Sequence, residues 1–288
     1  MTYKSKEISR REFLKNSALT ASGIATATTL NSCSSQTSKV PVIDVHMHLE
    51  NVGNYWEGLI EEVIEQYDYA SIDKGVIFNM WMPSRESNDR TLMGYEKYPD
   101  RFIPFGHIRP EDSDWEDEIK RMSDLGWKGI KLHQGELNKA DPDLRKTTMN
   151  ITEKLAKYKI QIDLIHLNNY DLIDEITREF PEIIFIIPHL GSQRGREGLK
   201  LICELAKNRK NMYLDTCNVG GYHLFGEAFQ WAGIDKILFG TDGFQCSPLV
   251  EKAKVETLKL PTPYRTPRLT DEQLSMVLGG NLANILGL

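Results

Sequence analysis

Cysteine is scarce in this chain, with 4 among 288 residues, which limits how the fold can be held together. One of them, Cys33, falls in the N-terminal segment considered below, so Cys203, Cys217 and Cys246 remain for the body of the protein. An odd number of thiols is unfavourable for a disulfide framework, because one thiol is left unpaired. Buried free thiols are therefore the interpretation that we favour, with one bridge between Cys217 and Cys246 as the open alternative.

Long hydrophobic runs are also missing. The apolar stretch at residues 16–30 is too short, and too rich in Ser and Thr, for a transmembrane helix. After residue 40 there is no low-complexity block and no Gly/Ser linker. The remaining residues, 41–288, fit one large domain better than two small ones.

The chain has no excess of positive charge, since it holds 35 Lys and Arg against 41 Asp and Glu. Residues 1–40 contribute six basic and two acidic side chains, which leaves 29 basic and 39 acidic ones and a net charge of −10 for the rest. A surface of this sign repels phosphate groups. We therefore expect neither nucleic acid nor an anionic membrane surface as a partner of the domain.

The first residues carry the features of an export signal. "SRREFLK" at 9–15 is a twin-arginine pattern, the apolar stretch follows it, and "LNSC" ending at Cys33 resembles a bacterial lipobox. We predict that residues 1–33 are a twin-arginine signal peptide with lipidation at Cys33, and that residues 34–40 are a short tether. The protein is then a periplasmic or cell-envelope lipoprotein that contacts the membrane only through its lipid anchor.

From residue 42 onward, short apolar runs alternate with longer amphipathic ones, as expected when helices cover a parallel sheet. Asp141 followed by Pro142 predicts one helix start, and Thr270 with Gln273 predicts a capping box at another. The predicted strands are 42–48, 75–80, 102–109, 129–134, 160–166, 183–190, 212–218 and 237–242. The predicted helices are 55–70, 86–97, 114–124, 142–157, 170–178, 195–208, 223–232 and 270–285.

Eight strands alternating with eight helices in about 250 residues predict an α/β fold, a (β/α)8 TIM barrel. The alternative is an open doubly wound sheet. The first predicted strand is not followed by the glycine-rich loop with which such sheets bind nucleotides, so we favour the barrel.

Histidines gather where a barrel places its active site, at the carboxyl ends of the strands. His46 and His48 are two residues apart in a predicted strand and should project from one face, as half of a metal site. Histidines scattered through a core would not respect the strand ends, so this distribution indicates a metal centre. The other histidines at or just beyond strand ends are His107, His133, His166, His189 and His223.

Five short motifs together resemble the amidohydrolase superfamily: "DVHMH", "DLIH", "PHLG", "FGTD" and the closing "GGNLANILGL". The resemblance is narrower to the branch that contains aminocarboxymuconate-semialdehyde decarboxylase and related hydrolases. It implies one divalent metal ion, usually zinc, held by His46, His48, His166 and Asp242. It also implies that His189 hydrogen-bonds a metal-bound water or assists proton transfer.

Elementary chemistry agrees with that assignment. Neutral imidazoles and one carboxylate leave the ion a positive charge, which lowers the pKa of a bound water towards about 7. Asp242 can accept the proton of that water, and His189 can move it onward, so both are predicted to be catalytic. Asp44 shares the predicted strand face of His46. A hydrogen bond to an imidazole N–H and a purely structural hydrogen bond are equally open for it.

Several residues are candidates for substrate binding. Lys131 lies where some superfamily members carry a carboxylated lysine between two metals, but we favour a single metal, with Lys131 or His133 lining the pocket. Arg109 and Arg194 could each pair with a substrate carboxylate, although loop arginines are more often solvated. Trp81 could cap the pocket or simply pack.

The favoured function is metal-dependent hydrolysis of a C–N or C–O bond in a small molecule. The first alternative is non-oxidative, metal-dependent decarboxylation of an aromatic or unsaturated acid, and the second is a non-catalytic metal- or ligand-binding lipoprotein. The expected partner is the small-molecule substrate, and a homodimer is the expected assembly because dimers are common among such barrels.

Overall fold

The computed structural model describes residues 40–49, 59–140, 143–192, 195–261 and 268–288, all within one compact unit. The predicted signal peptide and its Cys33, the tether, Arg194 and the predicted cap Asp141 lie outside the described residues. What was predicted for them stays a prediction.

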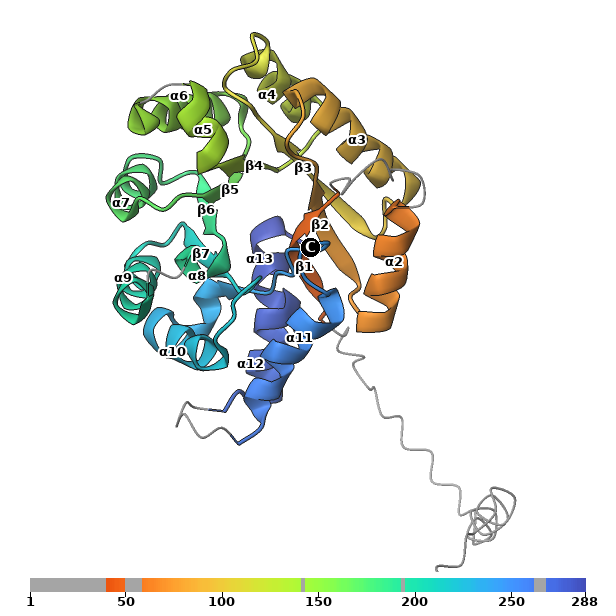
Figure 1. Ribbon diagram of the computed structural model, residues 1–288, viewed down its shortest axis with the longest axis vertical. Helices are drawn as coiled ribbons and strands as arrows, with labels where there is room; N and C mark the ends of the chain where they lie inside the picture. Colours follow the sequence, from red (N-terminus) through yellow and green to blue (C-terminus); the bar gives the residue numbers. More distant parts are fainter. Residues whose placement is uncertain (1–39, 50–58, 141–142, 193–194, 262–267) are drawn as a thin grey trace, which may run out of the picture. The chain divides into compact units, whose positions relative to one another are not determined.

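A single sheet of eight parallel strands forms the centre, in the sequential order β1 to β8, and the helices lie outside it (Figure 1). Val45 N–H donates to Phe239 O at 2.9 Å, and Asp242 N–H donates to His46 O at 2.8 Å, so the last strand returns to the first. The predicted (β/α)8 barrel is confirmed. The strands are β1 Ile43–His48, β2 Lys74–Phe78, β3 Phe102–His107, β4 Gly129–His133, β5 Ile162–His166, β6 Ile184–Ile187, β7 Met212–Asp215 and β8 Ile237–Leu238.

The helices that follow the strands lie close to their predicted ranges, and three short ones were not predicted. The unpredicted helices are α5 Gln134–Ala140, α8 His189–Ser192 and α11 Pro248–Glu256. The others are α2 Leu59–Ala70, α3 Ser84–Lys97, α4 Trp115–Asp124, α6 Leu144–Tyr158, α7 Tyr170–Glu179, α9 Gly195–Asn208, α10 Tyr222–Ala232, α12 Asp271–Ser275 and α13 Asn281–Leu286, with the π-helical turn Met276–Gly280 joining the last two.

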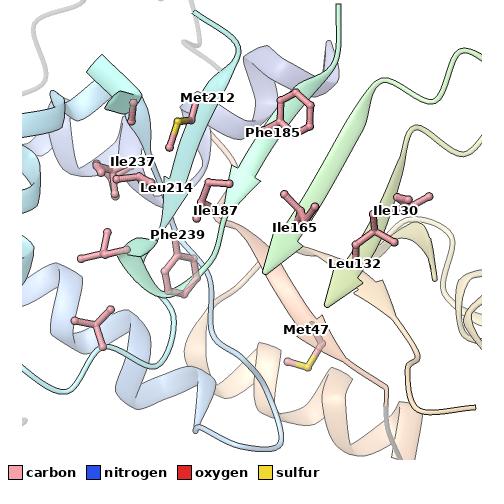
Figure 2. Packing of buried hydrophobic residues seen from close by; sticks show 14 of the residues in the cluster. Met47, Ile130, Leu132, Ile165, Phe185, Ile187, Met212, Leu214, Ile237 and Phe239 are labelled. Atoms are coloured by element: carbon pink, nitrogen blue, oxygen red, sulfur yellow. The ribbon is translucent and has the colours of Figure 1, made fainter. Parts of the chain in front are cut away.

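Alternation along the strands sorts apolar side chains into two buried clusters. Leu132, Ile165 and Ile187 belong to the cluster between strands and helices, part of which Figure 2 shows. Ile43 and Leu164 belong to a second cluster that includes residues of α13. Because both faces of the strands are largely buried, some of them, such as β6, are continuous apolar runs, as is typical of parallel sheets.

Strand β1 contains a bulge that reverses the expected direction of Asp44. Three steps along β1, from Asp44 to Met47, pair with two steps along β2, so β1 holds one extra residue. Asp44 accepts hydrogen bonds from Tyr67 Oη of α2 at 2.8 Å and from Thr241 Oγ1 at 2.5 Å. The prediction that Asp44 shares a face with His46 is wrong, and the structural role left open for it is confirmed.

Two helix starts illustrate which capping signals were local enough to predict. The capping box is confirmed, because Gln273 N–H donates to Thr270 Oγ1 at 3.1 Å and Thr270 N–H donates to Gln273 Oε1 at 3.0 Å. At the second start, α6 begins after Asp143, whose Oδ1 accepts from Lys146 N–H at 3.0 Å. The local pattern did not single out Asp143, and the structure identifies it as the cap of α6.

Candidate active site

A cavity of about 420 Å³ opens where the carboxyl ends of the strands meet. Most of the residues predicted for the site line it, although they come from distant parts of the chain. The lining residues are His46, His48, Met80, Trp81, Lys131, His133, His166, His189, Asn218, Asp242 and Gln245.

Three of the predicted metal ligands converge on one point of this cavity. His46 Nε2 and His48 Nε2 are 3.1 Å apart. Asp242 Oδ1 lies 3.4 Å from His46 Nε2 and 3.1 Å from His48 Nε2. Atoms that bind one ion at about 2.1 Å are themselves roughly 3.0–3.4 Å apart, so this donor set fits a divalent metal.

The fourth predicted ligand, His166, lines the same cavity beside His189 and His133. Its ring centroid is 4.9 Å from that of His189 and 4.7 Å from that of His133. A different set of four can also be drawn, because ligand atoms of His46, His189, Cys217 and Asp242 lie within 4.8 Å of one another. The geometry therefore brings His46, His48 and Asp242 together, in a cavity that His166 also lines.

Burial keeps three imidazoles of the site, those of His46, His133 and His166, in the neutral form in which histidine binds metals. Burial, with the charge of Lys131 as the next cause, lowers the pKa of His46 well below its usual value. The same two causes lower the pKa of His166 to about 3 and that of His133 to about 4. Asp242 behaves in the opposite sense. Burial acts to raise its pKa, but the hydrogen bond with His48 and the nearby imidazoles outweigh burial and hold that pKa well below the ordinary value.

Lys131 places a cationic side chain beside the converging ligands. Its Nζ lies 3.3 Å from His46 Nε2 and 5.4 Å from the centre of the Phe78 ring, and the residue is 1% exposed. Next to it, His133 Nδ1 accepts from Gly135 N–H at 3.0 Å, so the proton of the neutral ring is on Nε2. Lys131 and His133 therefore both offer donors, and both line the cavity as predicted.

Of the other candidates for substrate binding, the structure places Trp81 at the cavity and Arg109 away from its lining. Trp81 lines the cavity, is 51% exposed, and meets the His133 ring edge-on at a centroid distance of 5.2 Å. Arg109 is not among the cavity-lining residues: its guanidinium lies 3.0 Å from Glu111 and 3.7 Å from the buried Glu136. His107, which also approaches Glu136, is likewise outside the lining.

Sequence reasoning missed a buried polar group behind His46. Asp215 Oδ2 lies 2.8 Å from His46 Nδ1, and Cys217 Sγ lies 3.2 Å from Nδ1 of both His46 and His189. Burial, and then the charge of Asp215, raises the pKa of the Cys217 thiol well above its usual value. The position of Asp215 at the end of β7 was the available signal. Cys203 and Cys217 are buried free thiols, as predicted, and Cys246 is a free thiol that is only partly buried.

Residues with left-handed backbone gather at this cavity. The φ angles are 66° at Trp81, 58° at His189, 53° at Asn218 and 56° at Asp242. Side chains other than glycine seldom adopt this region, which costs on the order of 1 kcal/mol or more per residue. The prediction that His189 and Asp242 lie within the strands 183–190 and 237–242 is therefore wrong. Both residues follow their strands, β6 and β8, in strained turns.

The comparisons with known proteins agree with this fold. A family described as amidohydrolase matches residues 43–288, whereas no curated protein sequence matches the chain. The 2,6-dihydroxybenzoate decarboxylase from Rhizobium superposes with a TM-score of 0.62 at 16% identity, covering 86% of this chain and 98% of that one. A manganese-bound dihydroxybenzoic acid decarboxylase from Polaromonas sp. JS666 gives 0.62 at 15%, with 86% and 97% covered. The 4-oxalomesaconate hydratase from Rhodopseudomonas palustris gives 0.62 at 16%, with 85% and 95% covered.

Proposed function

The chain belongs to the amidohydrolase family of enzymes, and from that premise we propose that it catalyses the metal-dependent, non-oxidative decarboxylation of an aromatic or unsaturated carboxylic acid. The sequence had favoured hydrolysis, with decarboxylation as the alternative. Two structures of similar fold are decarboxylases acting on aromatic acids, and a third is a hydratase, which supports the alternative over hydrolysis.

The observation that carries the proposal is the position of Lys131. A buried ammonium group 3.3 Å from a metal-binding imidazole attracts an anionic substrate group to the point where the ligands converge. The Nε2–H of His133 provides a second donor in the same cavity. Lys131 and His133 line the cavity whereas Arg109 does not, so we assign recognition of the substrate carboxylate to Lys131 and His133.

In the proposed reaction the bond between the carboxylate carbon and the ring or alkene carbon breaks. Carbon dioxide leaves, the electron pair stays on the substrate carbon, and that carbon takes up one proton. His189 is placed to deliver the proton from a protonated ring, and Asp242 holds negative charge beside it. A divalent ion held by His46, His48 and Asp242 would act as a Lewis acid that stabilises negative charge on the substrate. The predicted zinc is one candidate, and the manganese of the Polaromonas enzyme makes Mn²⁺ a second.

The test is to load the protein with Zn²⁺ or Mn²⁺ and screen hydroxybenzoates and unsaturated acids for release of carbon dioxide, with amides and lactones in parallel. Lys131→Met should keep its metal and lose roughly 100-fold or more in kcat/KM, because a charge-assisted contact worth about 3 kcal/mol is removed. Lys139→Met changes an exposed lysine of α5 and should have no effect.

Hydrolysis of an amide or lactone without release of carbon dioxide would overturn the proposal in favour of the hydrolase function. Metal binding without turnover in either panel would favour a binding protein.

Cell location and assembly belong to the same proposal. We infer export by the twin-arginine route and anchoring through lipidated Cys33, from the N-terminal motifs alone. Mass spectrometry of the membrane fraction, with Cys33→Ala as control, tests the anchor. None of the described helices is both long and apolar enough to cross a bilayer. A homodimer remains a prediction, which light scattering can check.

A further inference from the structure

Behind the His46 ring lies a layer of polar groups that the proposed reaction does not use. At its centre is Asp215, which is fully buried at the end of β7. One of its oxygens, Oδ2, is 2.8 Å from His46 Nδ1. The other, Oδ1, accepts from the backbone N–H of His189 at 2.8 Å and from the Cys217 thiol at 2.9 Å. The Asp215 carboxylate therefore contacts both the ring of His46, which lies in β1, and the backbone of His189, which follows β6.

These contacts determine where each ring carries its proton. A carboxylate only accepts hydrogen bonds, so His46 donates from Nδ1–H and its Nε2 keeps a lone pair. That Nε2 is the atom that meets His48 and Asp242. His189 Nδ1 lies 3.1 Å from the carbonyl oxygen of Cys217, which also only accepts. His189 therefore has the same tautomer.

We propose that Asp215 is the positioning residue of this centre, fixing the tautomer of His46 and the place of His189, and that Cys217 packs between the two rings without binding the metal. The inference deepens the proposed function and rests on its metal centre. A carboxylate that accepts the N–H of a metal-binding imidazole orients the ring and makes it a stronger ligand.

The position of Cys217 argues against thiolate ligation, although its sulfur belongs to the alternative set of four. Sγ lies 3.2 Å from Nδ1 of both His46 and His189, and these are the nitrogens that carry protons. An ion between them would have to break the His46–Asp215 contact and the His189–Cys217 carbonyl contact. Metal binding at Nε2 of His46 leaves both in place.

Metal titration separates these possibilities without an activity assay. Metal-free wild type, Asp215→Asn, Cys217→Ser and the exposed control Asp235→Asn are titrated with Zn²⁺ against a chelating dye. Asp215→Asn should bind Zn²⁺ about 10–100-fold more weakly, while the other two variants match wild type. Affinity equal to wild type in Asp215→Asn would overturn the inference and leave the metal centre standing. Failure of wild type to bind would instead overturn the proposed function.

Two further measurements cover the case in which Asp215→Asn does not fold. Nitrogen NMR of histidine-labelled, metal-free wild type should show His46 protonated at Nδ1, and protonation at Nε2 would overturn the positioning role. In the Co²⁺-loaded wild type we expect no thiolate-to-cobalt charge-transfer band. Such a band, absent in Cys217→Ser, would make Cys217 a ligand and refute its assignment.

Discussion

At the scale of single residues, the site separates histidines that differ little in sequence context. His46 and His48 direct Nε2 towards Asp242, whereas His189 turns Nδ1 towards Cys217. The first two are therefore suited to hold an ion, and His189 is suited to exchange a proton at Nε2. The two roles predict different consequences of substitution.

His189→Ala should retain metal and lose about 10²–10⁴-fold in kcat, the usual contribution of a positioned acid or base. His46→Ala should lose the metal itself, because it removes a converging ligand. Metal content by mass spectrometry and steady-state kinetics distinguish the two. As a control, His223→Ala alters an exposed histidine that does not line the cavity. A His189→Ala protein without metal would move His189 into the ligand set.

At the scale of secondary-structure elements, the contacts of the closing segment of the chain explain why it contains Gly279 and Asn281. Asn281 Nδ2 donates to Ile234 O at 2.7 Å and to Ile237 O at 2.9 Å, which ties α13 to β8. A Cβ placed on Gly279 would lie 1.8 Å from Pro41 O, so only glycine fits where the π-helical turn passes the entry to β1. The closing motif "GGNLANILGL", which resembles the amidohydrolase superfamily, is thus also required for close packing.

Gly279→Ala should lower the free energy of unfolding by about 1–3 kcal/mol or more, because the clash is with backbone and cannot be relieved by a side-chain rotation. Urea unfolding followed by circular dichroism measures this. Gly220→Ala is the matched control, since a Cβ there meets nothing within 4 Å. Equal stability of the two variants would show that the turn can move away from Pro41.

At the scale of the whole molecule, the neutral histidines make stability depend on pH. The pKa values of His46, His133 and His166 are lower in the fold than in the unfolded chain. As the pH falls below about 6.5, the unfolded chain binds protons that the native state does not, and stability declines. Asp44 and Asp163 act in the opposite sense: burial raises the pKa of Asp44 to about 6 and that of Asp163 well above its ordinary value.

As the pH falls, the three histidines lower the free energy of unfolding and the two carboxyls raise it. The metal-free protein should therefore lose roughly 1–3 kcal/mol of stability between pH 6.5 and 4.5. In His133→Gln the loss should be smaller by about 1 kcal/mol, after allowance for the partial exposure of this ring. Urea unfolding at several pH values checks both statements. His223→Gln should follow wild type, and a His133→Gln curve parallel to wild type would refute the assigned pKa.

Local pattern in the sequence determined the eight strands, most of the helices, their order, and the strand ends at which His46, His133 and His166 lie. It could do so because side-chain periodicity and strand length are properties of neighbouring residues. Local pattern could not predict contacts between residues that are distant in the sequence. The bulge that turns Asp44 away, the 169 residues that separate His46 from Asp215, and the strained turns at His189 and Asp242 exist only once the barrel closes. The sequence thus determined that a metal centre lies at the strand ends, and the tertiary structure decided which side chains orient it.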